Sequence, residues 1–188
     1  GRLQTLPVGY DVVKKEWFDT AASGMRHFPG GERGEAVDWR DYPYTFHTAC
    51  YNCHVSQLST NYDPKTDTYH TTWTEPGINC ETCHGSATEH NKIARETAKG
   101  QPLAELRIIS TKTMTTAQRN DLCLSCHVKA NALAAEFRPK ERFYDYFDLV
   151  TLEDPDFYVD GRDLGENYTG TSWTMSPCVK SGKIDCMH

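Results

Sequence analysis

Three copies of one five-residue pattern constrain this chain more than any other feature of its sequence. The pattern is Cys-x-x-Cys-His, and it stands at residues 50–54, 80–84 and 123–127. Two cysteines three residues apart lie on one side of a helical turn, so both sulfur atoms can reach the same edge of a flat ring. The histidine that follows can ligate an iron at the centre of that ring. This arrangement is the attachment signature of c-type haem, and it predicts three covalent haem sites.

The residues of these sites divide into two roles. The sulfur atoms would bond to the edge of the haem, and the imidazoles would be the proximal iron ligands. The expected attachment cysteines are Cys50, Cys53, Cys80, Cys83, Cys123 and Cys126, and the expected proximal ligands are His54, His84 and His127.

Zinc and disulfide bonds are the alternatives for these cysteine pairs. Two Cys-x-x-Cys pairs can form a tetrahedral zinc site, but zinc does not require a histidine directly after the second cysteine. Disulfide-stapled domains are usually shorter than 188 residues, and their paired cysteines are usually far apart in sequence. A thioredoxin-like redox site needs a strand–helix setting that this sequence lacks. The repeated histidine therefore favours haem.

The composition is unusual for a chain that must form its interior from its own side chains. Only 38% of the residues are apolar, and the mean hydropathy is -0.66, yet 11% of the residues are aromatic, which argues against disorder. Three large flat macrocycles would replace the missing aliphatic core. The net charge of -6 excludes nucleic acid as an expected partner, and no apolar run is long enough to span a membrane.

Local patterns predict few regular elements. Residues 1–20 show short apolar alternation that predicts two strands in a hairpin, and a helix is expected from Tyr44 to about Leu58 around the first cysteine pair. Ser86 with Glu89 predicts a capping box and a helix over 87–98. Thr115 with Gln118 predicts a second capping box, which opens a helix over about 116–133. Long ordered loops are expected after residue 138.

The expected fold is a multihaem cytochrome c, with mostly irregular loops, short α-helices around the haem motifs and a small N-terminal β-hairpin. Two units are expected along the chain. A hairpin and loop lobe covers 1–40, and a multihaem domain covers 41–188.

Histidines outside the three motifs are candidates for the second axial iron ligand. Haem iron in electron-transfer proteins usually has a histidine or methionine in that position. Two of the candidates, three residues before the first motif and six after His84, are better placed for a neighbouring haem than for their own. A lone methionine is more often a packing residue, which makes Met25, Met114 and Met175 secondary candidates. The four histidine candidates are His27, His47, His70 and His90.

Three segments resemble a known family. TTWTEPGINCETCHGSATEH, LCLSCH and SWTMSPCVKSGKIDCMH are similar to the multihaem c-type cytochromes related to the tetrahaem electron carrier of hydroxylamine oxidation, and most similar to large exported members that are often fused to tetratricopeptide repeats. The resemblance covers residues 40–188, and LPVGYDVVKKEWFDT resembles the strand pair that precedes the haem segments in such proteins. It implies closely stacked haems with mostly two histidine ligands each. It departs at both termini, where family members continue.

The last residues, CVKSGKIDCMH, match the haem pattern only in part and have three interpretations. Cys178 and Cys186 can form a disulfide around Gly182. Alternatively, both cysteines and His188 form a site of unusual spacing. The third interpretation is a fourth Cys-x-x-Cys-His motif that starts at Cys186 and continues past residue 188, in a longer multihaem chain. The family resemblance favours this one, with Cys186 as an attachment cysteine of a fourth haem c.

Electron transfer through closely packed haems, each with two histidine ligands, is the expected function, without catalysis in this chain. A Cys-x-x-Cys-Lys motif, which often marks a catalytic iron with an open position, does not occur in the sequence. The alternatives are an enzyme subunit acting on nitrogen oxides or hydroxylamine and a cytochrome that polymerises into a filament. The expected partners are redox proteins or further copies of the chain. Because c-type haem is attached outside the cytoplasm, a periplasmic or extracellular location is expected.

Overall fold

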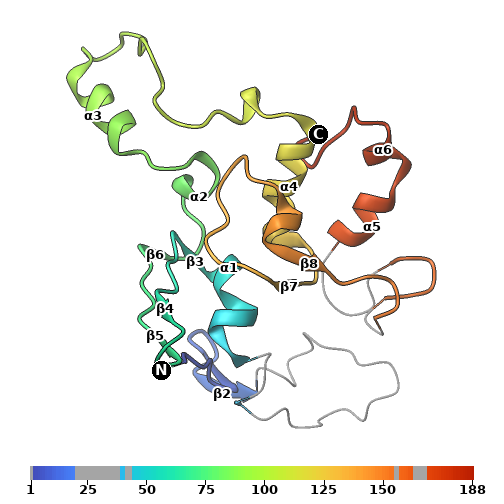
Figure 1. Cartoon of the computed structure of the whole chain (residues 1–188). Helices are drawn as coiled ribbons and strands as arrows, with labels where there is room; N and C mark the ends of the chain where they lie inside the picture. Colours follow the sequence, from blue (N-terminus) through green and yellow to red (C-terminus); the bar gives the residue numbers. More distant parts are fainter. Residues whose placement is uncertain (1, 20–38, 41–43, 155–156, 163–168) are drawn as a thin grey trace.

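The structure is a computed structural model that describes residues 2–19, 39–40, 44–154, 157–162 and 169–188. Its regular elements are short and are joined by long connections (Figure 1). The chain has an accessible surface of 12981 Å², whereas a compact monomer of 21.3 kDa exposes about 9100 Å². The polypeptide therefore buries less of its surface than a compact monomer of the same mass.

The N-terminal strands form the expected hairpin. Strand β1 (Val8–Asp11) pairs antiparallel with β2 (Glu16–Asp19). The Asp11 side chain accepts hydrogen bonds from two backbone N–H groups of the turn, at 2.9 Å each. Ahead of the hairpin, Thr5 N–H donates to the Tyr44 carbonyl and Phe46 N–H donates to the Leu3 carbonyl. This short ladder joins the N-terminal segment to the residues just before the first motif.

The first motif ends in a strand rather than in the longer helix expected to about Leu58. A π-helical turn, η2 (Phe46–Cys50), continues into α1 (Tyr51–His54). Val55 is extended, with φ -141° and ψ 158°, and begins β3 (Val55–Ser56). β3 pairs with β6 (Glu75–Pro76), and the extended backbone needed for this pairing ends the helix at His54. Strands β4 (Tyr62–Asp63) and β5 (Thr68–Tyr69) form a hairpin that lies between β3 and β6 in sequence.

The second motif forms α2 (Cys80–His84), and the chain then extends outward as an arm that carries α3 (Thr88–Glu96) (Figure 1). The expected capping box at Ser86 is wrong. The N-cap residue of α3 is Ala87, and no side chain caps the helix. The Ser86 hydroxyl instead bonds to the Thr88 hydroxyl, at 3.2 Å. The chain returns through η3 (Thr111–Thr113).

The third motif closes α4 (Thr116–His127), whose expected capping box is confirmed. Thr115 Oγ1 accepts from the Gln118 N–H at 3.2 Å, and Gln118 Oε1 accepts from the Thr115 N–H at 3.0 Å. The helix ends at His127, six residues earlier than expected, because Val128 is extended and leads into β7 (Ala130–Ala132).

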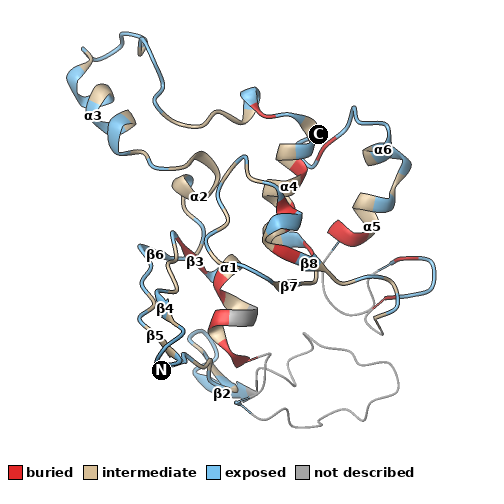
Figure 2. Cartoon of the chain, viewed as in Figure 1, coloured by how far each residue is buried: buried red, intermediate tan, exposed pale blue. Residues whose placement is uncertain are grey.

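The hydrophobic core lies behind α4. It consists of Leu124, Val128, Phe143 and Phe147, with the two phenylalanine rings stacked at 5.0 Å. Leu124 belongs to α4, and Val128 follows this helix. Phe143 belongs to η4 (Phe143–Asp145) and Phe147 to β8 (Phe147–Leu149), which pairs with β7. Figure 2 shows buried residues on α4 and β8, while α3 and its arm are exposed or intermediate.

Two short helices complete the fold beside α4. They are α5 (Gly170–Met175) and α6 (Pro177–Lys180). A Cβ atom at Gly170 would lie 2.4 Å from Val128 Cγ1 and 2.7 Å from the His127 carbonyl oxygen. Only glycine therefore allows α5 to approach the end of the third motif this closely.

Candidate haem-binding site

All three complete motifs adopt the helical turn that the sequence predicts. Cys50 is the N-cap residue of α1, Cys80 opens α2, and Cys123 lies in the last turns of α4. None of the eight cysteines forms a disulfide, including Cys178 and Cys186. Among the described residues, no three His, Cys, Asp or Glu side chains converge as a zinc site would require.

A buried serine connects the first motif to the second. Ser56, only 1% exposed, lies two residues after the first motif. Its hydroxyl donates to the Gly77 carbonyl at 2.6 Å, contacts the Thr82 hydroxyl at 2.8 Å, and accepts from the Asn79 N–H at 3.0 Å. Thr82 is one of the two variable positions of the second motif, and Asn79 is the N-cap residue of α2. Ser56 therefore fixes where α2 begins relative to α1.

Replacing Ser56 by alanine should loosen this connection. The change leaves buried polar groups without their partner, which costs about 1–3 kcal/mol per site. We expect a fall of that size in the free energy of unfolding, measured by urea denaturation of the haem-loaded protein. The Ser181→Ala variant, at an exposed hydroxyl that bonds only to the backbone of its own turn, is the control. Equal stability of the two variants would contradict this role for Ser56.

The first and third motifs touch through their second cysteines. The Cys53 thiol donates to the Cys126 carbonyl at 3.6 Å, and the Cys126 thiol donates to the Asn52 carbonyl at 3.3 Å. A hydrogen bond shared by the two thiols raises the pKa of Cys53 and lowers the pKa of Cys126. The attachment edges of these two sites therefore lie side by side.

The C-terminal residues are fastened to α4 beside the third motif. The side-chain oxygen of Asn120, a buried residue of α4, accepts from the Cys186 N–H at 3.0 Å and from the Trp173 indole N–H at 3.2 Å. Burial, followed by the charge of Cys186 nearby, raises the pKa of Cys123 to about 12. Cys186 therefore lies against the first cysteine of the third motif.

Asp185 anchors the same segment. Its side chain has no exposed surface and accepts from Arg119 Nη1 at 2.8 Å, from the Met187 N–H at 2.9 Å and from His188 Nδ1 at 3.2 Å. Burial alone would raise the pKa of Asp185, but the hydrogen bonds from Met187 and Arg119 outweigh it, and the pKa is lowered. Asp185 is therefore a carboxylate at neutral pH.

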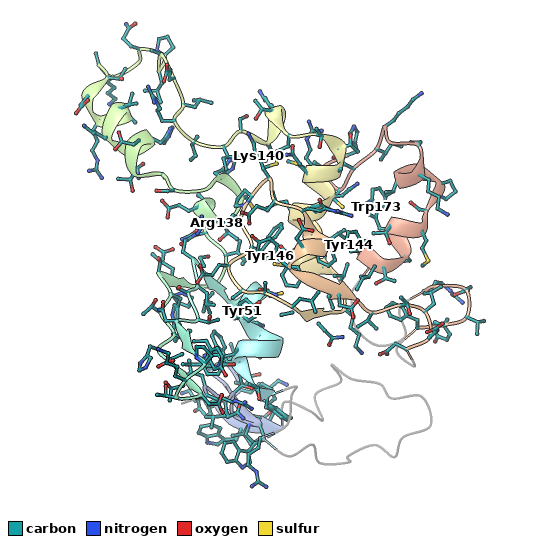
Figure 3. All side chains as sticks on the ribbon, in the orientation of Figure 1. Tyr51, Arg138, Lys140, Tyr144, Tyr146 and Trp173 are labelled. Atoms are coloured by element: carbon teal, nitrogen blue, oxygen red, sulfur yellow. The ribbon has the colours of Figure 1, made fainter. Side chains whose placement is uncertain are left out.

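Two cavities open among these elements and meet at the third motif. The larger has a volume of about 1060 Å³, beyond the roughly 300–1,000 Å³ of most small-molecule sites. The smaller has a volume of about 650 Å³ and lies between α4, α5 and the C-terminal residues. Arg138 and Trp173, labelled in Figure 3, line the larger and the smaller cavity respectively. Cys123 and His127 line both.

The donor set of these cavities fits haem. The larger is lined by apolar side chains such as Val55 and Ile78, which suit a flat apolar ring, together with motif cysteines and histidines of α2 and α4. The smaller has the indole of Trp173 and the thiol of Cys186 in its walls. The predicted attachment and ligand residues that line one or both cavities are Cys83, His84, Cys123, Cys126, His127 and Cys186.

Two histidines have one ring nitrogen bonded to a backbone carbonyl. His84 Nδ1 lies 2.7 Å from the Ile109 carbonyl oxygen, and His90 Nδ1 lies 2.6 Å from the Leu106 carbonyl oxygen. A carbonyl only accepts, so Nδ1 carries the proton in both rings, and Nε2 keeps its lone pair. That is the form in which imidazole ligates a metal.

The other predicted histidines are placed differently. His54 and His127 are exposed at the ends of their motifs, and His70 is exposed after β5, with Nε2 3.5 Å from the Thr68 hydroxyl. His27, like Met25, lies outside the described residues. Of the secondary candidates, Met114 is 3% exposed and Met175 is at the surface.

His47 is buried in a structural setting. Its Nδ1 accepts from the Leu3 N–H at 3.3 Å, its Nε2 bonds to the Thr71 hydroxyl, and its ring stacks on Tyr69 at 4.3 Å. Burial, the largest of several causes, lowers its pKa. An axial ligand needs a free ring nitrogen, and in this arrangement both nitrogens of His47 have partners.

Comparison with known proteins gives one match to a family model. Residues 21–85, about a third of the chain and including the first two motifs, match the family described as cytochrome c554 and c-prime. This match supports a multihaem c-type cytochrome. No curated protein matches the sequence.

One solved structure aligns with the chain. The crystal structure of the outer cell wall cytochrome OcwA aligns at 18% sequence identity with a TM-score of 0.46. The alignment covers 80% of this chain and 28% of that one, so the chain spans little more than a quarter of OcwA. Within the described residues of our structure, no helix has the length and hydropathy to cross a membrane.

Proposed function

We propose that this chain is an electron-transferring multihaem c-type cytochrome unit whose haem sites are gathered around α4. One observation carries the proposal. Three Cys-x-x-Cys-His turns come from distant parts of the sequence. The first touches α4 through Cys53 and Cys126, and the cavities beside α4 are lined by cysteines and histidines of the second and third. Haem attached at such turns supplies one-electron chemistry, and the protein supplies attachment, ligands and a low-dielectric environment.

The chain's own residues have separate roles in this proposal. The cysteine pairs of α1, α2 and α4 hold the haem edges, and His54, His84 and His127 are the proximal ligands. Cys186 holds a fourth group in the smaller cavity, where Asn120 and Asp185 position it. His90 is the foremost second ligand because its Nδ1 is already bonded. His27 and His70 complete the set, and His47 can join it only if its bond to Thr71 opens.

The wider organisation follows from these roles. The multihaem unit covers 41–188, and the hairpin lobe of 1–40 is joined to it through the ladder at Tyr44 and Phe46. We place the protein in the periplasm or outside the cell, where it would exchange electrons with redox proteins or further copies of itself. An enzyme would keep one iron open. Carbon monoxide should therefore not bind to the fully reduced, unmodified protein, and binding would favour the enzymatic alternative.

Replacing His90 by alanine should open one iron. We expect one high-spin haem that binds carbon monoxide when reduced, with covalent haem content unchanged, because no motif residue is altered. The readouts are the ferric absorption spectrum and carbon monoxide titration. His47→Ala is the matched comparison and should stay low-spin, because the ring nitrogens of His47 are engaged with Leu3 and Thr71. A fully low-spin His90→Ala protein would refute His90 as a ligand.

A further inference from the structure

One short stretch of backbone contacts two imidazole rings at once. The Ile109 carbonyl accepts from His84 Nδ1 at 2.7 Å, and the Leu106 carbonyl accepts from His90 Nδ1 at 2.6 Å. The Ile109 N–H also donates to the His84 carbonyl at 2.9 Å, so two hydrogen bonds join Ile109 to His84. His84 closes α2 and His90 lies in α3, yet residues 106–109 hold both rings.

The approach of this stretch to α2 is close. Gly85, the C-cap residue of α2, has φ 70°, a conformation that glycine adopts easily. A Cβ atom built there would lie 3.2 Å from Ile109 Cδ1. The contact between residues 106–109 and the end of the second motif is therefore fixed by packing as well as by hydrogen bonds.

Arg107 stands between the two carbonyls in an unusual conformation. Its φ is 49°, in the left-handed region that side chains other than Gly, Asn and Asp rarely adopt. The side chain is exposed and pairs with Glu105, with 2.5 Å between Nε and Oε2. Because the backbone at Arg107 connects Leu106 to Ile109, its left-handed turn determines how their carbonyls are directed relative to each other.

We propose that residues 106–109 are a positioning segment for two haem ligands, and that the left-handed backbone of Arg107 sets its geometry. The inference rests on the proposed function, in which His84 and His90 ligate iron. A hydrogen bond from Nδ1 to a carbonyl orients the ring and raises the donor strength of Nε2. A stronger donor stabilises ferric iron, so this segment lowers the reduction potentials of the two haems that His84 and His90 ligate.

The test compares two substitutions that remove the same charge but differ in backbone preference. Arg107→Gly keeps access to positive φ, whereas Arg107→Val strongly disfavours it. Glu105→Gln removes the ion pair and leaves the backbone of Arg107 unchanged. The readouts are the reduction potentials from spectroelectrochemical titration and the low-spin electron paramagnetic resonance signals of the ferric protein.

We expect Arg107→Val to raise the potentials of two haems together and to change their low-spin signals. Arg107→Gly and Glu105→Gln should leave both readouts unchanged. Equal shifts in the valine and glycine variants would assign the effect to charge and overturn the proposal, as would unchanged potentials in the valine variant. If the valine variant does not fold, Arg107→Ala, which disfavours positive φ less, takes its place in the same comparison.

A haem count on each variant separates this inference from the proposed function. Covalent haem measured as the pyridine haemochrome depends on the cysteine pairs and not on residue 107. Full haem content with unshifted potentials would overturn the positioning role alone. Haem missing from the unmodified protein would instead overturn the proposed function.

Discussion

At least three haems per chain should stay bound through acid–acetone extraction when the protein is produced with c-type maturation. The reason is covalent, because thioether bonds from six motif cysteines survive conditions that release ligated haem. The pyridine haemochrome spectrum identifies the attachment and, with the protein concentration, gives the count. Freely extracted haem, or fewer than three haems per chain, would refute the proposed sites.

Of the three motifs, the third is the one whose two cysteines should matter most for haem content and stability together. In Cys123→Ser/Cys126→Ser, the haem count should fall by one. That haem is also the group that fills the space between α4 and its neighbours, so the free energy of unfolding should fall as well. Cys178→Ser is the control, since Cys178 is exposed and belongs to no motif. We expect it to retain the full haem count, and a loss there equal to that of the double variant would contradict the site assignment.

The buried ion pair of Asp185 and Arg119 should hold the C-terminal residues on α4. Asp185→Ala leaves the Arg119 guanidinium, about one quarter exposed, without its carboxylate and frees the Met187 N–H. Breaking a buried pair on one side costs about 3 kcal/mol, at the lower end of the usual range because Arg119 is partly solvated. We expect local unfolding of residues 184–188, measured as faster hydrogen exchange, together with a lower free energy of unfolding.

Asp160→Ala is the control for this experiment, because the Arg162–Asp160 pair is exposed to solvent. Surface pairs contribute little to stability, so no measurable change is expected in this variant.

Protonation of Asp185 at low pH should weaken the attachment of the C-terminal residues, as the Asp185→Ala substitution does. Its folded-state pKa is lowered, so its contribution to stability is present above 3.8, the ordinary pKa of aspartate, and is lost as the pH falls through the lower folded value. Protection of residues 184–188 that is constant from pH 7 to 3 would contradict this.

The sequence predicts those features that depend on neighbouring residues. A Cys-x-x-Cys-His motif places its groups within one helical turn, and the reciprocal bonds of Thr115 and Gln118 span three residues. The box expected at Ser86 did not form, because α3 begins one residue later, with Ala87 as its N-cap residue. The Ala87 N–H donates instead to Glu81 of the preceding helix, at 2.6 Å, a contact that the local pattern does not contain.

Features that depend on distant residues were missed. In the sequence His47 looks available as an iron ligand, but its hydrogen-bond partner Thr71 lies 24 residues further along the chain, after β5. Asn120 gave no signal as an anchor for Cys186, which follows it by 66 residues. Ser56 likewise looks like an ordinary loop residue until Gly77 and Thr82 are placed around it. Only the fold brings these pairs together.

The position of the phenylalanine core has a consequence for how the protein matures. Leu124, between the cysteines of the third motif, is 3% exposed and packs with Phe143 and Phe147, whereas Cys53 and Cys80 in the first two motifs are exposed. An attachment enzyme needs an accessible cysteine pair. Cys123 and Cys126 are half-buried and line the cavities beside α4, so this pair still has open space in front of it after the core has formed around Leu124. The core can therefore close around Leu124 while the thiols of the third motif remain accessible from the cavities for haem attachment.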